Sequence, residues 1–384
     1  MNTSAAIRYD VAVVGAGPAG SSAAAELARR GCSVLLLEKA VLPRYKTCGG
    51  GLLRRASQFL PPSAASVVES SFNSVLLNFH AEDLQFTATR PEPLVQMTMR
   101  PALDQLLAQE AKNLGVQLVA GCALRQLEPQ PDGLALTTDQ GRFHARFVIA
   151  ADGVQSFTAK ASGWSPLPCL APALEWELPL PPQVFERFKA VARFDFGFVP
   201  AGYAWVFPKR HHLSVGILTT DRANVNLAAH LEAYLQSLGI PLEAGVEKHG
   251  YVIPLAPRRE PLFRDRVLLV GDAAGLVDPI TAEGISHALW SGRLAAEAMA
   301  SQQLDPARVG PHYQALLERH ILADLRAARW LARLIYHAPR LRHWAFRHQG
   351  ARITNFAADV VMGQRGYQAA LRDPRSYLKL LGLI

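Results

Sequence analysis

Short apolar runs alternate with glycine-rich turns near the start of the chain. The run Tyr9–Val14 is followed at once by GAGPAG, and the alanine-rich stretch SSAAAELARRG then predicts a helix that ends near Gly31. A second apolar run, SVLLLEK, ends on Glu38 and Lys39. Strand, tight turn, helix and strand in this order predict a βαβ unit, and therefore a parallel sheet with helices on its faces.

Two later segments repeat the pattern of a buried strand that ends in a turn. FVIAADGVQS places Asp152 and Gly153 directly after an apolar run. RVLLVGDAAGLVDPITAEGI places Asp272 after another such run and reaches Gly284 and Ile285 before a predicted helix. Ligands of doubly wound sheets bind beyond the carboxyl ends of parallel strands, so we expect Asp272 to lie at such a site.

The middle of the chain alternates apolar and polar positions with period two. ARFDFGFV, YAWVFPK, HHLSVGIL and HGYVIPL therefore predict an antiparallel sheet. Six aromatic residues here would form either an apolar wall of a cavity or an ordinary half-buried core: Phe194, Phe196, Phe198, Tyr203, Trp205 and Phe207. Lys209 and Arg210 follow, either to meet a phosphate or as charges at an exposed strand end.

The C-terminal part mixes leucine, isoleucine, tryptophan and phenylalanine with many arginines. HILADLRAARWLARLIYHAPRLRHWAFRHQGARI predicts amphipathic helices broken near Pro339. Two interpretations remain open, a helical cap with a solvated basic face and a basic, aromatic surface that binds anionic lipid. The predicted division is a discontinuous nucleotide-binding domain (1–75, 100–165 and 262–325), an antiparallel-sheet substrate domain (76–99 and 166–261) and a C-terminal helical segment (326–384).

Composition and charge narrow the class of protein. The 384 residues are 49% hydrophobic and 19% charged, which is typical of a globular chain, and the formal charge is +8. This excess favours acidic partners, but no nucleic-acid-binding module is recognised, so we expect none. Four cysteines without paired or metal-ligand spacing favour a reducing cytoplasm and no metal site. No uninterrupted apolar run reaches the length of about 18 residues that a spanning helix needs.

The glycines of GAGPAG have the spacing of a dinucleotide fingerprint. Gly15 allows the tight turn, Gly17 lets backbone approach a pyrophosphate, and Gly20 allows the helix to pack closely on the strand. Glu38 lies 18 residues after Gly20, near the usual position of the acid that binds a ribose diol. An acid there argues against a 2′-phosphate, so the fingerprint predicts FAD or NAD.

The stretch PRYKTCGGGL places Cys48 directly before three glycines. Consecutive glycines suit neither helix nor strand, which indicates backbone that passes close to another group. The thiol of Cys48, beside Lys46, is either a proton donor with a lowered pKa or a small packing residue.

Five motifs together resemble the FAD-dependent superfamily that includes p-hydroxybenzoate hydroxylase. GAGPAG, ADG and GDAAGLVDPITAEGI match its three flavin motifs, while PRYKTCGGGL and YAWVFPK match signatures of the geranylgeranyl reductase family. The resemblance covers roughly residues 8–300. It implies an α/β fold, in which a Rossmann-type FAD-binding domain carries an antiparallel substrate sheet and a helical C-terminal segment.

The resemblance also implies roles for individual residues. The ADP half of FAD would be held by Gly15, Gly17, Ala19, Gly20, Glu38 and Lys39. Arg100 would lie near the phosphates, Leu124 would lend its backbone to the adenine, and Asp152 with Gly153 would form the turn to the neighbouring domain. Asp272 would bind the ribityl chain or pyrophosphate. The ring system would lie by Cys48, Gly49, Gly284 and Ile285, and the substrate by Tyr203, Trp205 and Phe207.

The activity implied is hydride transfer from reduced FAD to the carbon–carbon double bonds of a geranylgeranyl or polyprenyl chain. NAD(P)H or a ferredoxin-like protein would reduce the flavin, and the location would be cytoplasmic, peripheral on the inner membrane face if the tail binds lipid. The alternatives are a flavin monooxygenase or halogenase of the same superfamily and a flavin-binding protein without turnover.

Overall fold

The computed structural model describes residues 7–80, 83–221, 225–242 and 245–372. The first elements are strand β1 (Ile7–Val14), helix α1 (Pro18–Arg29) and strand β2 (Val34–Glu38), which confirms the predicted βαβ unit. β1 pairs in parallel with β2 and with β11 (Gly141–Ala150). β11 pairs in parallel with β18 (Val267–Leu269), and β2 with β8 (Gln117–Ala120).

The remaining strands of this sheet are antiparallel additions. β9 (Leu124–Gln130) and β10 (Gly133–Thr138) form a hairpin beside β11, and β17 (Phe263–Arg264) lies beyond β18 at the edge. Five parallel strands therefore form the centre of the sheet, and their carboxyl ends point the same way.

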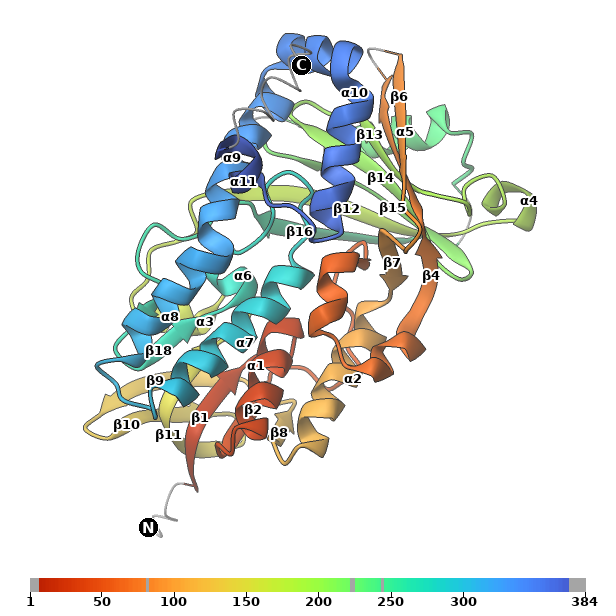
Figure 1. Cartoon of the computed structure of the whole chain (residues 1–384). Coiled ribbons are helices and arrows are strands. Elements are labelled where there is room, and N and C mark those ends of the chain that lie inside the picture. Colours follow the sequence, from red (N-terminus) through yellow and green to blue (C-terminus); the bar gives the residue numbers. More distant parts are fainter. Residues whose placement is uncertain (1–6, 81–82, 222–224, 243–244, 373–384) are drawn as a thin grey trace.

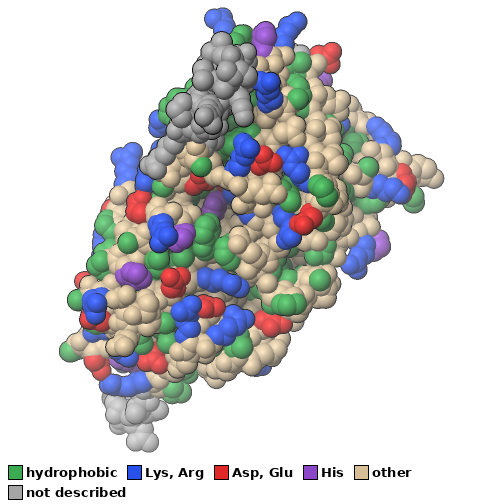
Figure 2. Space-filling model, in the orientation of Figure 1, with side chains coloured by type: hydrophobic (Ala, Val, Ile, Leu, Met, Phe, Trp, Pro, Cys, Tyr) green, Lys and Arg blue, Asp and Glu red, His purple; other side chains and the backbone are tan. Residues whose placement is uncertain are grey.

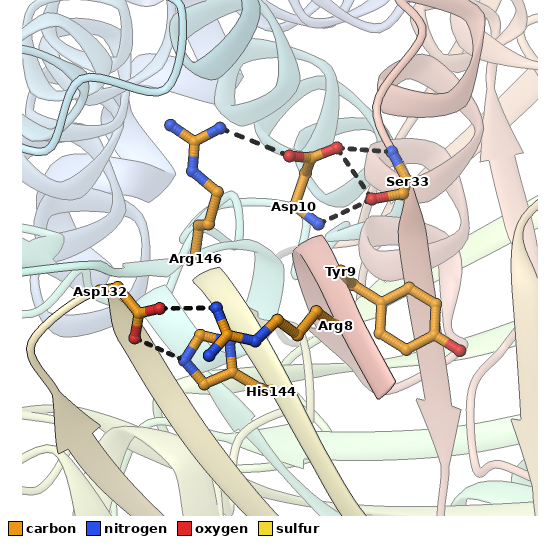
Figure 3. Close-up of a pocket in the computed structure, with 7 residues that line it drawn as sticks. All are labelled: Arg8, Tyr9, Asp10, Ser33, Asp132, His144 and Arg146. Carbon is orange, nitrogen blue, oxygen red and sulfur yellow. Dashed lines mark hydrogen bonds and ion pairs between the residues drawn. The ribbon is translucent and has the colours of Figure 1, made fainter. Parts of the chain in front are cut away.

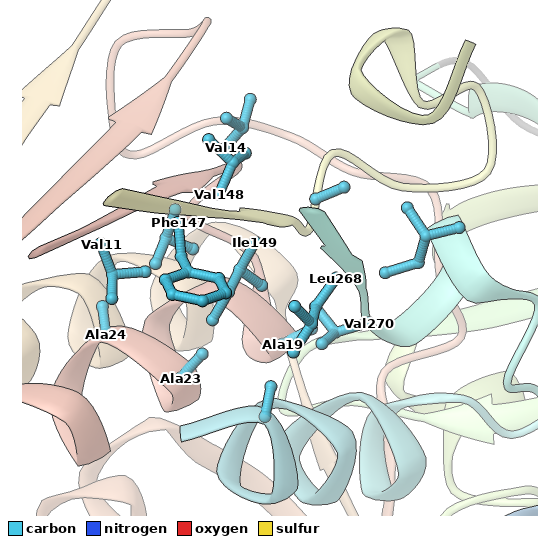
Figure 4. Packing of buried hydrophobic residues seen from close by; sticks show 14 of the residues in the cluster. Val11, Val14, Ala19, Ala23, Ala24, Phe147, Val148, Ile149, Leu268 and Val270 are labelled. Atoms are coloured by element: carbon cyan, nitrogen blue, oxygen red, sulfur yellow. The ribbon is translucent and has the colours of Figure 1, made fainter. Parts of the chain in front are cut away.

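Helices cover the parallel sheet and bury its apolar residues. α1 packs beside α7 (Ile285–Ser301) and α2 (Arg100–Asn113). Val11, Phe147 and Leu268, from three neighbouring strands, are fully buried (Figure 4). Burial of each large apolar side chain stabilises the fold by about 1.5–3 kcal/mol, which explains why these strands read as continuous apolar runs.

The second sheet is mainly antiparallel and has seven strands. Its order is β16 (Glu247–Pro254), β12 (Leu170–Pro179), β15 (His212–Thr219), β14 (Gly202–Pro208), β13 (Ala192–Phe196), β5 (Ser74–Phe79) and β6 (Leu84–Thr89). The four alternating stretches of the sequence are β13, β14, β15 and β16, so the predicted sheet is present. Figure 1 shows this sheet above the parallel sheet. The predicted fold class is confirmed.

A small third sheet lies between the other two. β7 (Val95–Thr98) pairs with β3 (Gly51–Leu53) and β4 (Val68–Phe72). The sequence-based division assigned β7 to the substrate domain and β3 and β4 to the nucleotide-binding domain. Backbone pairing joins the three strands, because β3 follows the glycine run directly and needs a hydrogen-bonding neighbour there.

The shorter elements connect these layers. They are the 3₁₀ turns Arg54–Phe59 and Pro62–Val67 and the helices α3 (Phe157–Ala161), α4 (Pro182–Phe185), α5 (Leu227–Ser237) and α6 (Gly271–Ala274).

The C-terminal helices run along both sheets. α8 (Val309–Leu317) continues through a π-helical turn (Glu318–Leu322) into α9 (Ala323–His337), and α10 (Pro339–Val361) and α11 (Tyr367–Arg372) follow (Figure 1). The break falls at Ala338–Pro339, as the proline predicted. The end of the expected segment, 373–384, lies outside the described residues. No helix in the described ranges has both the length and the apolar character needed to cross a bilayer.

Candidate functional site

The segments that follow β1 and β11 leave the parallel sheet at the same edge. Gly15 follows β1, Ala151 follows β11, and their backbones approach so closely that a Cβ on Gly15 would lie 2.4 Å from the Ala151 carbonyl oxygen. Gly15 also has φ +104°, where only glycine is unstrained. A Cβ on Gly20 would lie 1.8 Å from the Gly15 carbonyl oxygen. These two glycines are therefore required by the protein itself.

Gly17 has a different environment. It precedes the first residue of α1, and a Cβ there would meet only guanidinium nitrogens of Arg44 and Arg100, both 3.8 Å away. The free N–H groups of the first turn of α1 and two cations thus border the same space. A helix N-terminus with paired guanidinium groups fits the diphosphate of a dinucleotide.

An ion-pair network fixes these cations. The Glu38 carboxylate accepts hydrogen bonds from the N–H of Ala16 at 2.9 Å and pairs with Arg44 at 3.3 Å. Arg44 and Arg100 both pair with Asp104, with nitrogen–oxygen distances of 2.9 and 2.8 Å. Although burial opposes it, Asp104 raises the pKa of Arg100, so the site keeps its positive charge.

Glu38 and Arg100 were predicted to lie at this site, whereas Arg44 and Asp104 were not. Arg44 precedes Cys48 by four residues, and Asp104 follows Arg100 by one helical turn. The spacing of Arg100 and Asp104 on a predicted helix is a usable signal. The contact of Arg44 with Asp104 joins residues 60 positions apart in the chain, so no local sequence pattern predicts it.

The other predicted flavin residues lie around this edge with different surroundings. Asp152 accepts hydrogen bonds from the N–H and hydroxyl of Thr158, each at 2.9 Å, so its carboxylate organises the turn into α3. Asp272 follows β18, as predicted. Its backbone carbonyl accepts a hydrogen bond from the N–H of Gly275 at 3.0 Å, whereas its carboxylate accepts none from the described residues. Its Oδ1 lies 3.4 Å from where a Cβ of Gly284 would stand. Asp272 is therefore the carboxylate here that is free to bind a polyol.

Four other residues were predicted to contact the cofactor, and the contacts seen for them are with the protein itself or with solvent. Their roles in cofactor binding stay predictions. Ala19 packs against Gly271, Leu124 is buried at the start of β9, Lys39 is exposed after β2, and Gly153 has φ +80° in its turn.

The loop that carries Cys48 packs against aromatic residues. A Cβ on Gly49 would lie 2.8 Å from the ring of Phe207, and one on Gly50 would lie 1.9 Å from the Thr98 carbonyl oxygen. Gly50 also has φ +67°, and its N–H donates to the Cys48 sulfur at 3.4 Å. On the side where a Cβ would project, the glycines approach protein atoms.

The aromatic wall is formed by one face of β14 together with β13. Tyr203, Trp205 and Phe207 are buried in one cluster with Phe196, and Phe194 packs against it. Phe198 lies outside this cluster and packs on Tyr234 instead, because β13 ends at Phe196 and Gly197 turns the chain at φ +101°. The wall therefore holds five of the six predicted rings.

Lys209 is buried, which rules out the predicted place at an exposed strand end. Its ammonium donates to the carbonyl oxygens of Gly49 at 2.6 Å and Thr98 at 3.1 Å. Burial lowers the pKa of Lys209, while the nearby carboxylates of Glu175 and Glu177 act in the opposite direction. The cation therefore ties the end of β14 to the Cys48 loop. Arg210 is exposed, as expected of a strand end.

The structure also has a surface hollow of about 280 Å³ (Figure 3). Its lining residues are Arg8, Tyr9, Asp10, Ser33, Asp132, His144 and Arg146. They stand at the amino-terminal side of β1 and β11, whereas α/β sheets bind ligands at the carboxyl ends of the strands. The charged groups also pair with one another, Arg8 and His144 with Asp132 and Arg146 with Asp10. The Gly17 edge, rather than this hollow, therefore has the geometry that suits a dinucleotide.

Comparison with known proteins supports FAD as the cofactor. The family model described as FAD binding domain matches residues 8–177, and that described as tryptophan halogenase matches residues 100–361. The fold and site thus define a FAD-dependent oxidoreductase.

Relatives of known name narrow the class. Digeranylgeranylglycerophospholipid reductase 1 of Methanopyrus kandleri is 33% identical over 76% of this chain and 80% of its own length. Menaquinone reductase of Mycolicibacterium smegmatis is 30% identical over 87% of this chain and 85% of its own length. The chain belongs to the geranylgeranyl reductase family.

A solved structure shows the same fold over nearly the whole chain. A geranylgeranyl bacteriochlorophyll reductase-like protein of Thermoplasma acidophilum superposes with a TM-score of 0.74 and 22% identity, covering 98% of this chain and 96% of that protein.

Proposed function

We propose that this enzyme reduces carbon–carbon double bonds of a geranylgeranyl or longer polyprenyl chain. Bound FAD, once reduced, supplies the hydride for one alkene carbon, and the protein supplies a proton for the other. Names of relatives support an isoprenoid substrate, since they include reductases of digeranylgeranylglycerophospholipid and of menaquinone.

One observation carries the proposal. The Cys48–Gly51 loop lies directly on the aromatic wall, so close that a Cβ on Gly49 would approach the Phe207 ring to 2.8 Å. The same loop follows Arg44, whose guanidinium borders the diphosphate site at Gly17. This short segment thus brings the Cys48 thiol beside the aromatic wall and connects it to the proposed diphosphate site. Such an arrangement suits an apolar alkene that is held beside a flavin.

Cys48 is the proposed proton donor. Its thiol is half-buried, and the guanidinium of Arg100 and the ammonium of Lys46 interact electrostatically with its sulfur. The thiol would give its proton to the alkene carbon that does not receive the hydride.

The test is an anaerobic half-reaction. The FAD-loaded enzyme is reduced with dithionite, mixed with geranylgeranyl diphosphate or a geranylgeranylated lipid, and followed by flavin reoxidation and product mass. We expect reoxidation without oxygen and a gain of two hydrogens for each alkene reduced. In Cys48→Ala, FAD should stay bound while reoxidation slows about 10²-fold or more.

Cys169→Ala is the matched control, because Cys169 is a half-buried free thiol that precedes β12. Its rate should equal that of the wild type. Equal rates in both variants would remove Cys48 from the chemistry and leave the reductase proposal standing.

A halogenase or monooxygenase is the second candidate, favoured by the halogenase family model over residues 100–361. It predicts a flavin that stays reduced with the isoprenoid until oxygen enters, followed by hydroxylation, epoxidation or halogenation of a substrate. That outcome would replace the reductase proposal.

The electron donor is proposed to be NAD(P)H or a ferredoxin-like protein. The sequence has one clear dinucleotide fingerprint, which we propose binds the FAD. A nicotinamide donor would therefore bind transiently at another place. Anaerobic bleaching of the flavin by NADPH, NADH or reduced ferredoxin distinguishes the donors.

We also propose that the enzyme works as a peripheral protein on the inner face of the cytoplasmic membrane. Trp330, Leu341 and Trp344 on α9 and α10 expose 53%, 47% and 47% of their surface. Exposed Arg333 and Arg340 lie in the same segment. Figure 2 shows basic and hydrophobic side chains at this end of the molecule. Exposed rings among arginines suit the boundary of an anionic bilayer.

Vesicle sedimentation tests this surface. The wild type should pellet with phosphatidylglycerol-containing vesicles more than with phosphatidylcholine alone, and Trp330→Ser/Trp344→Ser should lose most of this binding. Leu114→Ser is the control, because Leu114 is an exposed apolar residue beyond the end of α2. Equal binding by all three proteins would refute the lipid surface.

A further inference from the structure

The loop between α6 and α7 has an unusual backbone. Ala282 has φ +56°, a left-handed conformation that costs a non-glycine residue about 1 kcal/mol. The Asp278 carboxylate accepts hydrogen bonds from the N–H groups of Ile280 at 2.9 Å and Thr281 at 3.2 Å. Two backbone hydrogen bonds within the loop, from Ala282 N–H to the Asp278 carbonyl oxygen and from Asp278 N–H to the Glu283 carbonyl oxygen, support the same shape. The carbonyl oxygens of Ile280 and Thr281 accept their hydrogen bonds from outside the loop.

Tyrosine hydroxyls from distant elements donate to two carbonyl oxygens of the loop and to the Asp278 carboxylate. Tyr336 on α9 donates to the Ile280 carbonyl oxygen at 2.5 Å, and Tyr367 on α11 donates to Asp278 Oδ2 at 3.1 Å. Tyr203 of the aromatic wall donates to the Thr281 carbonyl oxygen at 2.6 Å. Burial raises the pKa of all three phenols, so the hydroxyls remain protonated donors.

A buried cation completes the set of anchors. Arg55 pairs with Asp278 at 3.2 Å and with Glu283 at 3.0 Å. Tyr336 and Tyr367 lie 56 and 89 residues from their acceptors, so the C-terminal helices contribute two of the anchors of this loop.

The loop leads directly into the proposed flavin site. Gly284 ends it and is the N-cap residue of α7, and a Cβ on Gly284 would lie 3.4 Å from the Asp272 carboxylate. A shift of the loop would therefore move the N-terminus of a 17-residue helix relative to Asp272. The positive end of that helix stabilises negative charge, and its effect falls off within one turn.

We propose that Tyr336 and Tyr367 are positioning residues for the flavin, which makes the C-terminal helical segment a part of the flavin site. The inference rests on the proposed placement of FAD beside Gly284. The two hydroxyls hold the loop in its strained shape, and the loop aims the N-terminus of α7 at the flavin ring.

The test is the Tyr336→Phe/Tyr367→Phe variant, which removes two hydroxyls and keeps both rings. We expect the Kd for FAD to rise about tenfold, as the loss of part of two buried hydrogen bonds would produce. The midpoint potential of the bound flavin should become more negative, because the reduced anion loses the aligned helix N-terminus.

Tyr313→Phe is the matched control. Tyr313 on α8 is fully buried and donates to the Leu269 carbonyl oxygen at 2.7 Å, in the same domain but away from the loop. It should lose as much thermal stability per hydroxyl as the double variant, with an unchanged flavin potential. A double variant with the potential and Kd of Tyr313→Phe would overturn the inference.

Hydrogen exchange of residues 276–284 in protein without FAD separates this inference from the proposed function. Faster exchange there in the double variant, but not in Tyr313→Phe, supports the anchoring role whatever the substrate proves to be. Unchanged exchange refutes it, even if the enzyme reduces isoprenoids.

Discussion

Replacement of Lys209 by methionine tests how the Cys48 loop is held. The change keeps the length and apolar stem of the side chain and removes the ammonium. Lys209 has 2% of its surface exposed, so water cannot replace the lost donor. The carbonyl oxygens of Gly49 and Thr98 would each lose a charged donor at 2.6 and 3.1 Å.

The magnitude follows from what remains buried. Hydrogen bonds from a charged donor are worth about 1.5–3 kcal/mol each, and Glu175 and Glu177 would lose a neighbouring cation. Methionine is neutral, so the variant does not have to bury a charged ammonium group. This smaller cost of burial offsets part of the free energy lost with the hydrogen bonds. We expect the free energy of unfolding to fall by about 3–5 kcal/mol, which is typical for removal of one member of a buried charge group.

The assay is urea denaturation of the apoprotein in a double-mutant cycle with Glu175→Gln. Glu175 is fully buried, accepts a hydrogen bond from Ser214 at 2.5 Å, and has a pKa raised by burial and by Glu177. Its neutral replacement should cost less in the Lys209→Met background than in the wild type, with a coupling energy of about 1–3 kcal/mol. Lys189→Met, at an exposed lysine paired with Glu186, should cost at most about 1 kcal/mol.

Additivity of the two substitutions within about 0.5 kcal/mol would refute the electrostatic part of this reasoning. A Lys209→Met protein as stable as Lys189→Met would refute the anchoring role altogether.

Two further predictions follow from the same geometry. Gly17→Ala should leave the stability of the apoprotein within about 1 kcal/mol of the wild type while the Kd for FAD rises at least about tenfold. Gly20→Ala should instead unfold at a lower temperature, because its Cβ would meet the Gly15 carbonyl oxygen. Fluorescence titration with FAD and thermal melts would contradict this if both variants behave alike. Burial and Arg55 lower the pKa of His287 to about 3 in the folded protein, whereas a histidine in the unfolded chain has a pKa near 6.5. Below pH 6.5 the unfolded chain therefore binds a proton at His287 that the folded chain does not bind. Stability should therefore fall by about 1.4 kcal/mol per pH unit below 6.5, and His287→Leu, but not His211→Leu, should flatten that slope in urea denaturation.

The local features of the site could be predicted from the sequence because they depend on short-range patterns. The βαβ unit, the fingerprint glycines, Asp272 after its strand and the helix break at Pro339 each follow from periodicity or from the backbone preferences of glycine and proline. The resemblance added FAD and the reductase family, and the relatives show that family.

The contacts that join distant segments could not be predicted. Lys209 was expected either to meet a phosphate or to lie at an exposed strand end. It is instead buried and donates to the carbonyl oxygens of Gly49 and Thr98, because the hairpin of β14 and β15 packs its end against β7 and the glycine loop. Phe198 lies outside the aromatic wall because Gly197, which has a positive φ, follows the end of β13 and turns the chain.

The sequence by itself therefore determined the fold class and the edge proposed to bind the dinucleotide, since strand order and turn conformation depend on residues close together in the chain. Only the tertiary structure decided which charges and hydroxyls hold that edge in shape. Arg44 with Asp104, Arg55 with Asp278, and Tyr336 with Ile280 join segments that are 56 or more residues apart. Such pairs have no local preference to reveal them, because each forms only where packing buries its partners together.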